Sequence, residues 1–173
     1  MGSGKTVVGE RLSKEVNLPF RDLDQEIVQR QGMDIPSIFE KKGEINFRKT
    51  EIQVLKELLQ SKESFVLSMG GGTPCYGNNM EIIKQTKDVR SIYLKASLET
   101  LLRRLWRERS SRPLIAHLAS QELLEDFLRK HLFERQYYYN QSDLVVEVDD
   151  KEVHSIVTQV KDLLNEHGAV TSL

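Results

Sequence analysis

The chain has 173 residues, of which 39% are hydrophobic and 29% charged, and its formal net charge is −1. This length fits one globular domain with a sizeable core, and the balanced charge excludes the overall basic field that draws proteins to nucleic acid or anionic membranes. No apolar stretch approaches the roughly 20 residues needed to span a bilayer, and nothing at the N-terminus reads as a signal peptide. Cys75 is the single cysteine, so a disulfide framework is excluded and we expect a cytoplasmic protein.

The first residues match the end of a phosphate-binding loop. Gly4, Lys5 and Thr6 fit the last positions of the pattern G-x-x-x-x-G-K-[ST]. In such a loop the backbone N–H groups surround a phosphate, the lysine reaches the β- and γ-phosphates, and the hydroxyl ligates Mg²⁺. The pattern's first glycine and the strand that feeds it would precede Met1. We therefore expect either that the numbered chain begins inside a longer product or that a strand has been lost.

Helical periodicity follows the loop over residues 4–16, and Pro19 ends that helix. Residues 20–24 are predicted to be extended. Asp22 and Asp24 then share one side of a strand, where a metal ion or a cation would relieve their repulsion. The alternative is an acidic turn in which Asp24 caps the next helix.

Residues 25–31 are predicted to form that helix, and a short helix follows from Asp34 until Gly43 breaks it. The longer helix over residues 44–59 places Arg48 and Glu51 three positions apart, on one face. Glu51 could steer the Arg48 fork toward a carboxylate, or the two could form only an exposed ion pair of little energetic value.

Residues 65–69 form an apolar run typical of a buried parallel strand, and Gly70, Gly71 and Gly72 follow it directly. Three consecutive glycines at the carboxyl end of such a strand indicate close approach of the backbone to a ligand. The competing interpretation is a flexible turn, which would require a single glycine.

The remaining chain alternates between helices and strands. We predict helices over residues 80–86, 98–109, 122–140 and 153–164, strands over 89–94 and 143–148, a polar break over 110–117, and a frayed tail after His167. Such alternation requires crossover connections. The fold class predicted is therefore α/β, with three α/β/α layers around a mainly parallel sheet of four visible strands.

Six motifs occur in a fixed order: Gly-Ser-Gly-Lys-Thr, Asp-Leu-Asp, Phe-Arg-x-x-Glu, Gly-Gly-Gly, Arg-Pro-Leu and Glu-Arg-x-x-Tyr. This ordered set resembles the shikimate kinase family, a small group of P-loop kinases related to the nucleoside monophosphate kinases. The resemblance extends from Met1 to about Lys151. It implies five strands, the first of them central, and transfer of the γ-phosphoryl group of ATP to the 3-hydroxyl of shikimate, in chorismate and aromatic amino acid biosynthesis.

The resemblance also implies roles for individual residues. The catalytic residues would be Lys5, Asp24 and Arg112, and Thr6 and Asp22 would hold Mg²⁺. The remaining ATP-binding residues would be Gly2, Ser3, Gly4, Val7, Arg104 and Lys151, and the shikimate-binding residues would be Asp24, Arg48, Gly70, Gly71, Gly72 and Arg135. We expect one monomeric domain over residues 1–173, with a shikimate-binding segment at about 24–60 and a lid at about 109–121.

Three features depart from the family pattern. Met69 replaces a small hydroxyl residue, so a contact near the metal could be lost or could move to Ser68. The lid lacks its common glycine, and Arg107 competes with Arg104 for the position against adenine. Two alternative functions remain open at this point: a P-loop kinase of another hydroxy acid such as gluconate, which the Asp-x-Asp motif disfavours, and a non-catalytic nucleotide-binding module.

Overall fold

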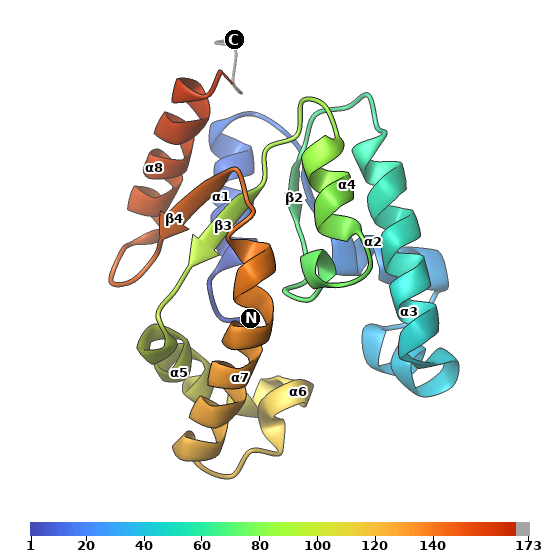
Figure 1. The fold of residues 1–173 in the computed structure, drawn as a ribbon, viewed down its shortest axis with the longest axis vertical. Helices are drawn as coiled ribbons and strands as arrows, with labels where there is room; N and C mark the ends of the chain where they lie inside the picture. The colour runs from blue at the N-terminus through green and yellow to red at the C-terminus, as the bar shows by residue number, and fades with distance from the viewer. Residues whose placement is uncertain (169–173) are drawn as a thin grey trace.

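A computed structural model describes residues 1–168, and the expectation of a frayed tail falls largely on residues 169–173, outside the described part. The elements are drawn in Figure 1. In chain order they are α1 (Lys5–Glu15), β1 (Phe20–Asp22), α2 (Leu23–Gln31), α3 (Ile35–Leu59), β2 (Val66–Ser68), η1 (Thr73–Cys75), α4 (Asn79–Gln85), β3 (Ile92–Lys95), α5 (Leu98–Arg107), η2 (Arg109–Ser111), α6 (Pro113–Ala116), α7 (Gln121–Tyr139), β4 (Leu144–Glu147) and α8 (Val153–Glu166).

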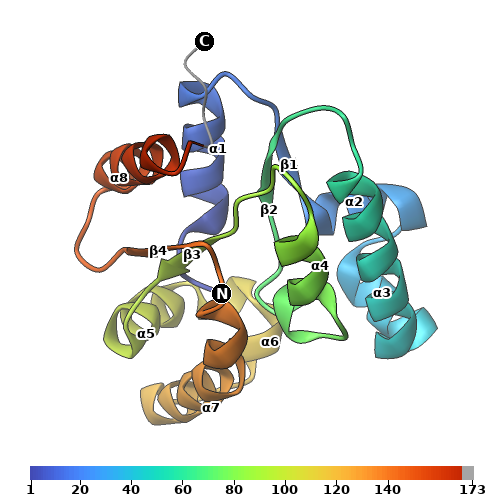
Figure 2. The same cartoon turned by 45° about the horizontal axis from the view of Figure 1, so that its top comes forward.

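The strands pair in parallel, as predicted, but in two separate pairs. β1 pairs with β2, and β3 pairs with β4, with Asp22 opposite Ser68 and Lys95 opposite Glu147 at the carboxyl ends. Figure 2 shows both pairs with helices around them. The α/β class is confirmed, whereas one continuous sheet is not seen among residues 1–168.

A cavity of about 780 Å³ separates the two pairs. Its walls include residues of both β2 and β3, together with apolar side chains of α1 and α8 such as Val8 and Val160. The same cavity reaches Lys5, Gly70 and Arg135 at the carboxyl ends of the strands. The space between the sheets is therefore continuous with the region in which the sequence places the phosphate loop and the triple glycine.

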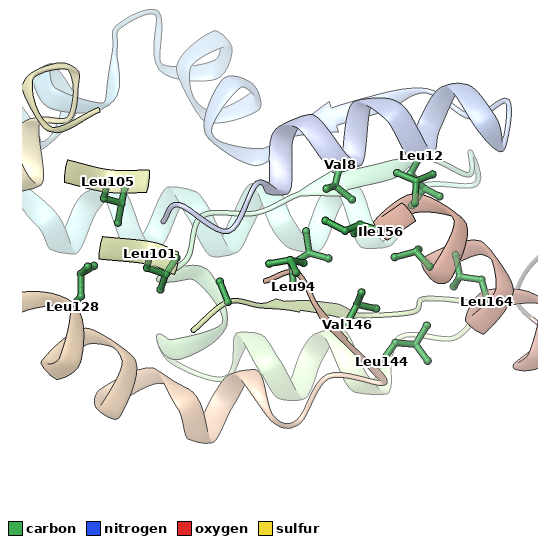
Figure 3. Close-up of a cluster of buried hydrophobic side chains, with 14 of the residues drawn as sticks. Val8, Leu12, Leu94, Leu101, Leu105, Leu128, Leu144, Val146, Ile156 and Leu164 are labelled. Carbon is green, nitrogen blue, oxygen red and sulfur yellow. The ribbon is translucent and has the colours of Figure 1, made fainter. Parts of the chain in front are cut away.

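Two apolar clusters support these pairs. The larger joins α1, α5, α7 and α8 to β3 and β4, and Figure 3 shows Val8 and Leu12 of α1 facing Ile156 of α8 and Leu94 of β3. The second joins α2, α3 and α4 through side chains such as Leu23, Ile27 and Leu55, which are fully buried. Within residues 1–168 no helix has the length and apolar character required to cross a membrane.

One predicted helix boundary is shifted and another is confirmed. The strand ends at Asp22, whose carboxylate accepts hydrogen bonds from the backbone N–H groups of Asp24 and Gln25 and so caps α2. Asp24 therefore lies in the first turn of a helix, and the prediction that both aspartates share one face of a strand is wrong. Gly43 leaves helical geometry (φ 77°, ψ 167°), so the predicted break is confirmed, and α3 consists of two helical segments that meet at this kink.

Gly9 allows α1 to pack closely against β1. A Cβ atom at this position would lie 2.7 Å from the Phe20 ring. Overpacking of this kind costs about 1–3 kcal/mol, against a gain of about 1 kcal/mol from the helix propensity of alanine. We expect Gly9→Ala to lower the free energy of unfolding by roughly 1 kcal/mol in urea titrations. Glu10→Ala, at an exposed neighbouring position, is the control, and a Gly9→Ala protein at least as stable as the parent would contradict this packing argument.

Candidate active site

The N-terminal loop has the backbone geometry of an anion site at the start of α1. Gly2 and Gly4 adopt positive φ angles of 76° and 88°, which glycine tolerates without a steric penalty. Gly4 caps α1 without a side-chain hydrogen bond, so the first N–H groups of this 11-residue helix have no side-chain acceptor. These free donors and the helix dipole favour a phosphate at this position. Thr6 and Val7 are exposed in the same first turn.

Lys5 lies among charged groups from four other elements. Burial is the main cause that lowers the pKa of its ammonium group, and Arg112 and Arg135 lower it further, whereas Asp24 and Asp22 act in the opposite direction. The phosphate loop, the first turn of α2, the lid and α7 therefore converge on one space.

Asp24 lies on the acidic side of that space. Its Oδ1 atom is 3.5 Å from the position that a Cβ on Gly70 would take. Burial raises the pKa of the Asp24 carboxyl, and the nearby carboxylates of Asp22 and Glu51 raise it further, while Lys5 and Arg48 partly oppose these effects. A carboxylate with this environment accepts a proton more readily than an ordinary aspartate, which suits it to orient and deprotonate a hydroxyl group.

Arg48 is held by two carboxylates of its own helix. Its NH1 donates to Glu51 Oε2 at 3.0 Å, and its NH2 donates to Glu44 Oε1 at 3.3 Å. Glu51 is 1% exposed and also accepts a 2.8 Å hydrogen bond from the Thr73 hydroxyl. The interpretation of Arg48 and Glu51 as a mere exposed ion pair is therefore wrong, because burial and a second partner fix Glu51.

The triple glycine passes between the candidate substrate residues. A Cβ atom on Gly70 would lie 3.1–3.8 Å from side-chain atoms of Thr73, Asp24 and Glu51. A Cβ on Gly71 would lie 3.3 Å from the Tyr139 hydroxyl and 3.8 Å from Arg135, and one on Gly72 would lie 3.4–3.5 Å from Tyr76 and Arg48. None of the three glycines adopts a positive φ angle. Gly70 and Gly71 therefore leave room that a side chain would crowd, with closest approaches of 3.1 Å to Thr73 and 3.3 Å to Tyr139, whereas a Cβ on Gly72 would make ordinary contacts. The run passes between Asp24, Arg48 and Arg135, and a flexible turn does not explain it.

A hydrogen bond from Tyr139 connects the triple glycine to α7. Its hydroxyl donates a 2.6 Å hydrogen bond to the Gly71 carbonyl, and a Cβ on Gly71 would lie 3.8 Å from Arg135 NH1. Tyr139 and Arg135 are four residues apart on one helix face. α7 thus brings a cation and a structural hydroxyl to the same glycine.

Arg112 lies between η2 and α6, in the segment expected to be a lid. Its Nε donates to Glu108 Oε2 at 3.0 Å, and its NH2 contacts the same oxygen. The Arg112 side chain is 38% exposed, and its charge acts on Lys5. The guanidinium thus lies near the phosphate loop while paired with a carboxylate of its own segment.

Arg104 crosses the start of the phosphate loop. It donates to the Gly2 carbonyl at 3.3 Å and to the Val148 carbonyl at 3.4 Å. Arg107 is exposed, which favours Arg104 over Arg107 as the arginine beside a nucleotide. Lys151 follows Val148 by three residues but donates to Gln159 of α8 at 3.0 Å, so the structure does not bring its ammonium group to the loop.

Four residues that support the candidate site were not predicted from the sequence: Glu44, Thr73, Tyr76 and Tyr139. The i,i+4 spacings of Glu44 with Arg48 and of Arg135 with Tyr139 were visible in the sequence, and could have indicated both pairs. The contacts of Thr73 and Tyr76 with α3 join residues 22 and 32 positions apart, so no local pattern reveals them.

Comparison with known proteins agrees with this geometry. The family model described as shikimate kinase matches residues 1–165. A shikimate kinase from Flavobacterium psychrophilum is 48% identical over 95% of this chain and 94% of the relative, and one from Flavobacterium johnsoniae is 46% identical over the same shares. The crystal structure of shikimate kinase from Bacteroides thetaiotaomicron has a TM-score of 0.86 and 31% identity, and covers 95% of this chain and 94% of its own. That of the Acinetobacter baumannii shikimate kinase in complex with shikimate has a TM-score of 0.82 and 33% identity, with 96% and 89% covered. The chain therefore belongs to the shikimate kinase family.

Proposed function

We propose that this chain transfers the γ-phosphoryl group of ATP to the 3-hydroxyl of shikimate, releasing ADP and shikimate 3-phosphate. The observation that carries the proposal is the shared environment of Lys5 and Asp24, which join a phosphate loop to a carboxylate with a raised pKa. Two arginines beside the triple glycine add a site for the carboxylate of the acceptor. The product would enter chorismate and aromatic amino acid biosynthesis.

In this proposal the triphosphate lies along the first turn of α1. Gly2, Ser3, Gly4 and Val7 line it with backbone groups, Lys5 neutralises the β- and γ-phosphates, and Arg104 borders the base. Lys151 would border the base only after its side chain leaves Gln159 of α8.

The residues present fit a magnesium ion. Magnesium usually takes one or two protein oxygens and completes its shell with water and phosphate oxygens. Thr6 is exposed at the start of α1, and the described hydrogen bonds of Asp22 use its Oδ1, which leaves Oδ2 for a metal-bound water. Ser68 lies opposite Asp22 in the strand register and could support it in place of Met69. When bound, the ion would neutralise charge on the β- and γ-phosphates.

The acceptor would be held at both ends. Arg48 and Arg135 would bind its carboxylate, with Glu51 keeping Arg48 in place, and the backbone of Gly70, Gly71 and Gly72 would line its ring. Asp24 would accept the proton of the attacking hydroxyl as its oxygen approaches the γ-phosphorus. Lys5 and Arg112 would neutralise charge on the transferring group, and Arg112 must exchange Glu108 for a phosphate oxygen to do so.

A coupled assay of ADP release tests the proposal. We expect turnover that requires both ATP and shikimate, and none when gluconate replaces shikimate. Turnover with ATP and gluconate, but not with ATP and shikimate, would indicate a kinase of another hydroxy acid. ATP binding measured by calorimetry without ADP release in the presence of shikimate would indicate a nucleotide-binding module and contradict the proposal.

Removing Arg48 should weaken acceptor binding selectively. We expect Arg48→Ala to raise the KM for shikimate about 100-fold, because truncating one member of a buried charge pair typically costs several kcal/mol. The KM for ATP should change little, as measured by varying each substrate in turn. Arg30→Ala, which removes an exposed pair with Glu57, is the matched control. An unchanged KM for shikimate would place its carboxylate elsewhere.

We also propose that residues 1–173 act as one monomeric, cytoplasmic domain, with an acceptor-binding segment at about 24–60 and a lid at about 109–121. The lone cysteine agrees with a reducing compartment. Sedimentation of the purified chain tests the monomer, and protease protection of residues 109–121 by ATP tests the lid.

A further inference from the structure

Tyr76 contacts the candidate carboxylate-binding arginine face to face. The Cζ atom of Arg48 lies 3.6 Å from the centre of the Tyr76 ring, whereas the Phe47 ring lies 5.1 Å from it. A guanidinium at this distance over an aromatic ring is attracted by the ring's negative face. Tyr76 comes from the extended segment after η1, far from α3 in sequence.

The hydroxyl of Tyr76 fixes the ring in this position. It donates a 3.0 Å hydrogen bond to Glu44 Oε1, the same oxygen that accepts from Arg48 NH2 at 3.3 Å. Glu51 holds the other terminal nitrogen of Arg48 at 3.0 Å. Ring, hydroxyl and two carboxylates together determine the plane of the guanidinium.

Gly72 lies beside this stack. A Cβ on Gly72 would lie 3.4 Å from Tyr76 Cε2 and 3.5 Å from both terminal nitrogens of Arg48. These are ordinary van der Waals distances, so position 72 packs directly against both the ring and the guanidinium.

The held guanidinium still has free donors. Each terminal nitrogen uses one N–H for a glutamate, so a second N–H on each remains. The Arg48 Nε atom is buried without a hydrogen-bond partner in the described residues. Arg48 is thus oriented before a carboxylate arrives, and little side-chain entropy remains to be lost when one binds.

We propose that Tyr76 is a positioning residue that selects carboxylate-bearing acceptors by holding Arg48 in the plane required for binding. This inference rests on the proposed function, in which Arg48 binds the shikimate carboxylate. The described contacts of Tyr76 join it to Arg48 and Glu44 on the acceptor side, so its loss affects acceptor binding while phosphoryl transfer at saturation continues. The hydroxyl contributes less than the ring, because Glu44 keeps its bond to Arg48 when the hydroxyl is removed.

The test compares Tyr76→Leu with Tyr76→Phe. We expect Tyr76→Leu to raise the KM and the calorimetric Kd for shikimate roughly tenfold, and Tyr76→Phe to restore both to within about threefold of the parent. The kcat at saturating shikimate and the KM for ATP stay unchanged in both variants. Phe133→Leu, at a position 85% exposed on α7, is the control and leaves every parameter unchanged. Thermal unfolding of all variants accompanies the assays.

The outcomes distinguish failure of the positioning role of Tyr76 from failure of the proposed function. A Tyr76→Leu protein that binds shikimate like the parent, while Arg48→Ala weakens binding, overturns the role of Tyr76 and leaves the proposed function intact. Equal loss in the leucine and phenylalanine variants, or a fall in kcat without a change in KM, also overturns it. Absence of shikimate binding by the parent chain overturns the proposed function and this inference together.

Discussion

Replacing Asp24 with asparagine is expected to lower kcat by about 10²- to 10⁴-fold while leaving the KM for ATP nearly unchanged. The amide keeps the shape of the side chain but cannot accept the proton of the attacking hydroxyl. Burial and the carboxylates of Asp22 and Glu51 disfavour the charged form of Asp24, which raises its pKa. The asparagine protein should therefore have a higher melting temperature than the parent at neutral pH, since the group that is lost is charged and repelled there.

The control is Asp126→Asn, which makes the same chemical change at an exposed position on α7. It should alter neither kcat nor the melting temperature. Near-parental kcat in Asp24→Asn would remove Asp24 from the reaction, even if the stability change occurs. A stability gain without loss of turnover would leave Asp24 as a strained structural residue.

The raised pKa of Asp24 also sets the direction of the pH profile. Turnover needs the carboxylate, so activity falls as the pH drops through this pKa. Because the pKa lies above that of an ordinary aspartate, the acid limb of kcat/KM for shikimate should lie at a higher pH than a solvent-exposed aspartate would give. A limb at or below the ordinary aspartate pKa would contradict the raised value.

Removing Arg112 is expected to lower kcat by about 10³-fold, because a cation supplied to the transferring phosphoryl group contributes on this scale in related chemistry. Arg112 already acts electrostatically on Lys5, but its guanidinium is paired with Glu108. The loss should appear in kcat, and the KM for shikimate should change far less. Single-turnover measurements with Arg112→Ala separate the chemical step from product release.

Arg129→Ala is the matched control for this variant. Arg129 forms the same kind of i,i+4 pair, with Glu125, on the solvent face of α7. It should have no effect on kcat, since exposed pairs contribute little. If Arg112→Ala changed kcat no more than Arg129→Ala does, Arg112 would have no part in the transfer step.

Regular elements with strong periodicity could be predicted from the sequence. The helices over α1, α5, α7 and α8 and the strands β2, β3 and β4 were expected to within a few residues, because each carries an apolar pattern and a cap or breaker. Parallel pairing followed from their alternation. The separation of the strands into two pairs could not be predicted, because the continuity of a sheet depends on which segments are adjacent in space.

Site residues that belong to a sequence motif could be predicted, whereas residues placed in the site by tertiary packing could not. The roles of Lys5, Asp24, Arg48 and Arg112 follow from motifs that resemble those of the shikimate kinase family, whereas spacing alone left Arg48 and Glu51 open to interpretation as an exposed ion pair. The placement of Asp24 in a helix depends on the Asp22 side chain, which ends β1 and accepts hydrogen bonds from the backbone N–H groups of residues 24 and 25. The support given by Tyr76 to Arg48 depends on a contact between chain segments that no sequence period links.

The central claim is that the phosphate donor and the acceptor meet between Lys5 and Asp24. A crystal structure of the chain with ADP, Mg²⁺ and shikimate tests it most directly. The account predicts the 3-hydroxyl of shikimate within hydrogen-bonding distance of the Asp24 carboxylate, the shikimate carboxylate on Arg48 and Arg135, and the β-phosphate of ADP on Lys5. Shikimate bound with its carboxylate away from both arginines, or with its 3-hydroxyl turned away from Asp24, would contradict it.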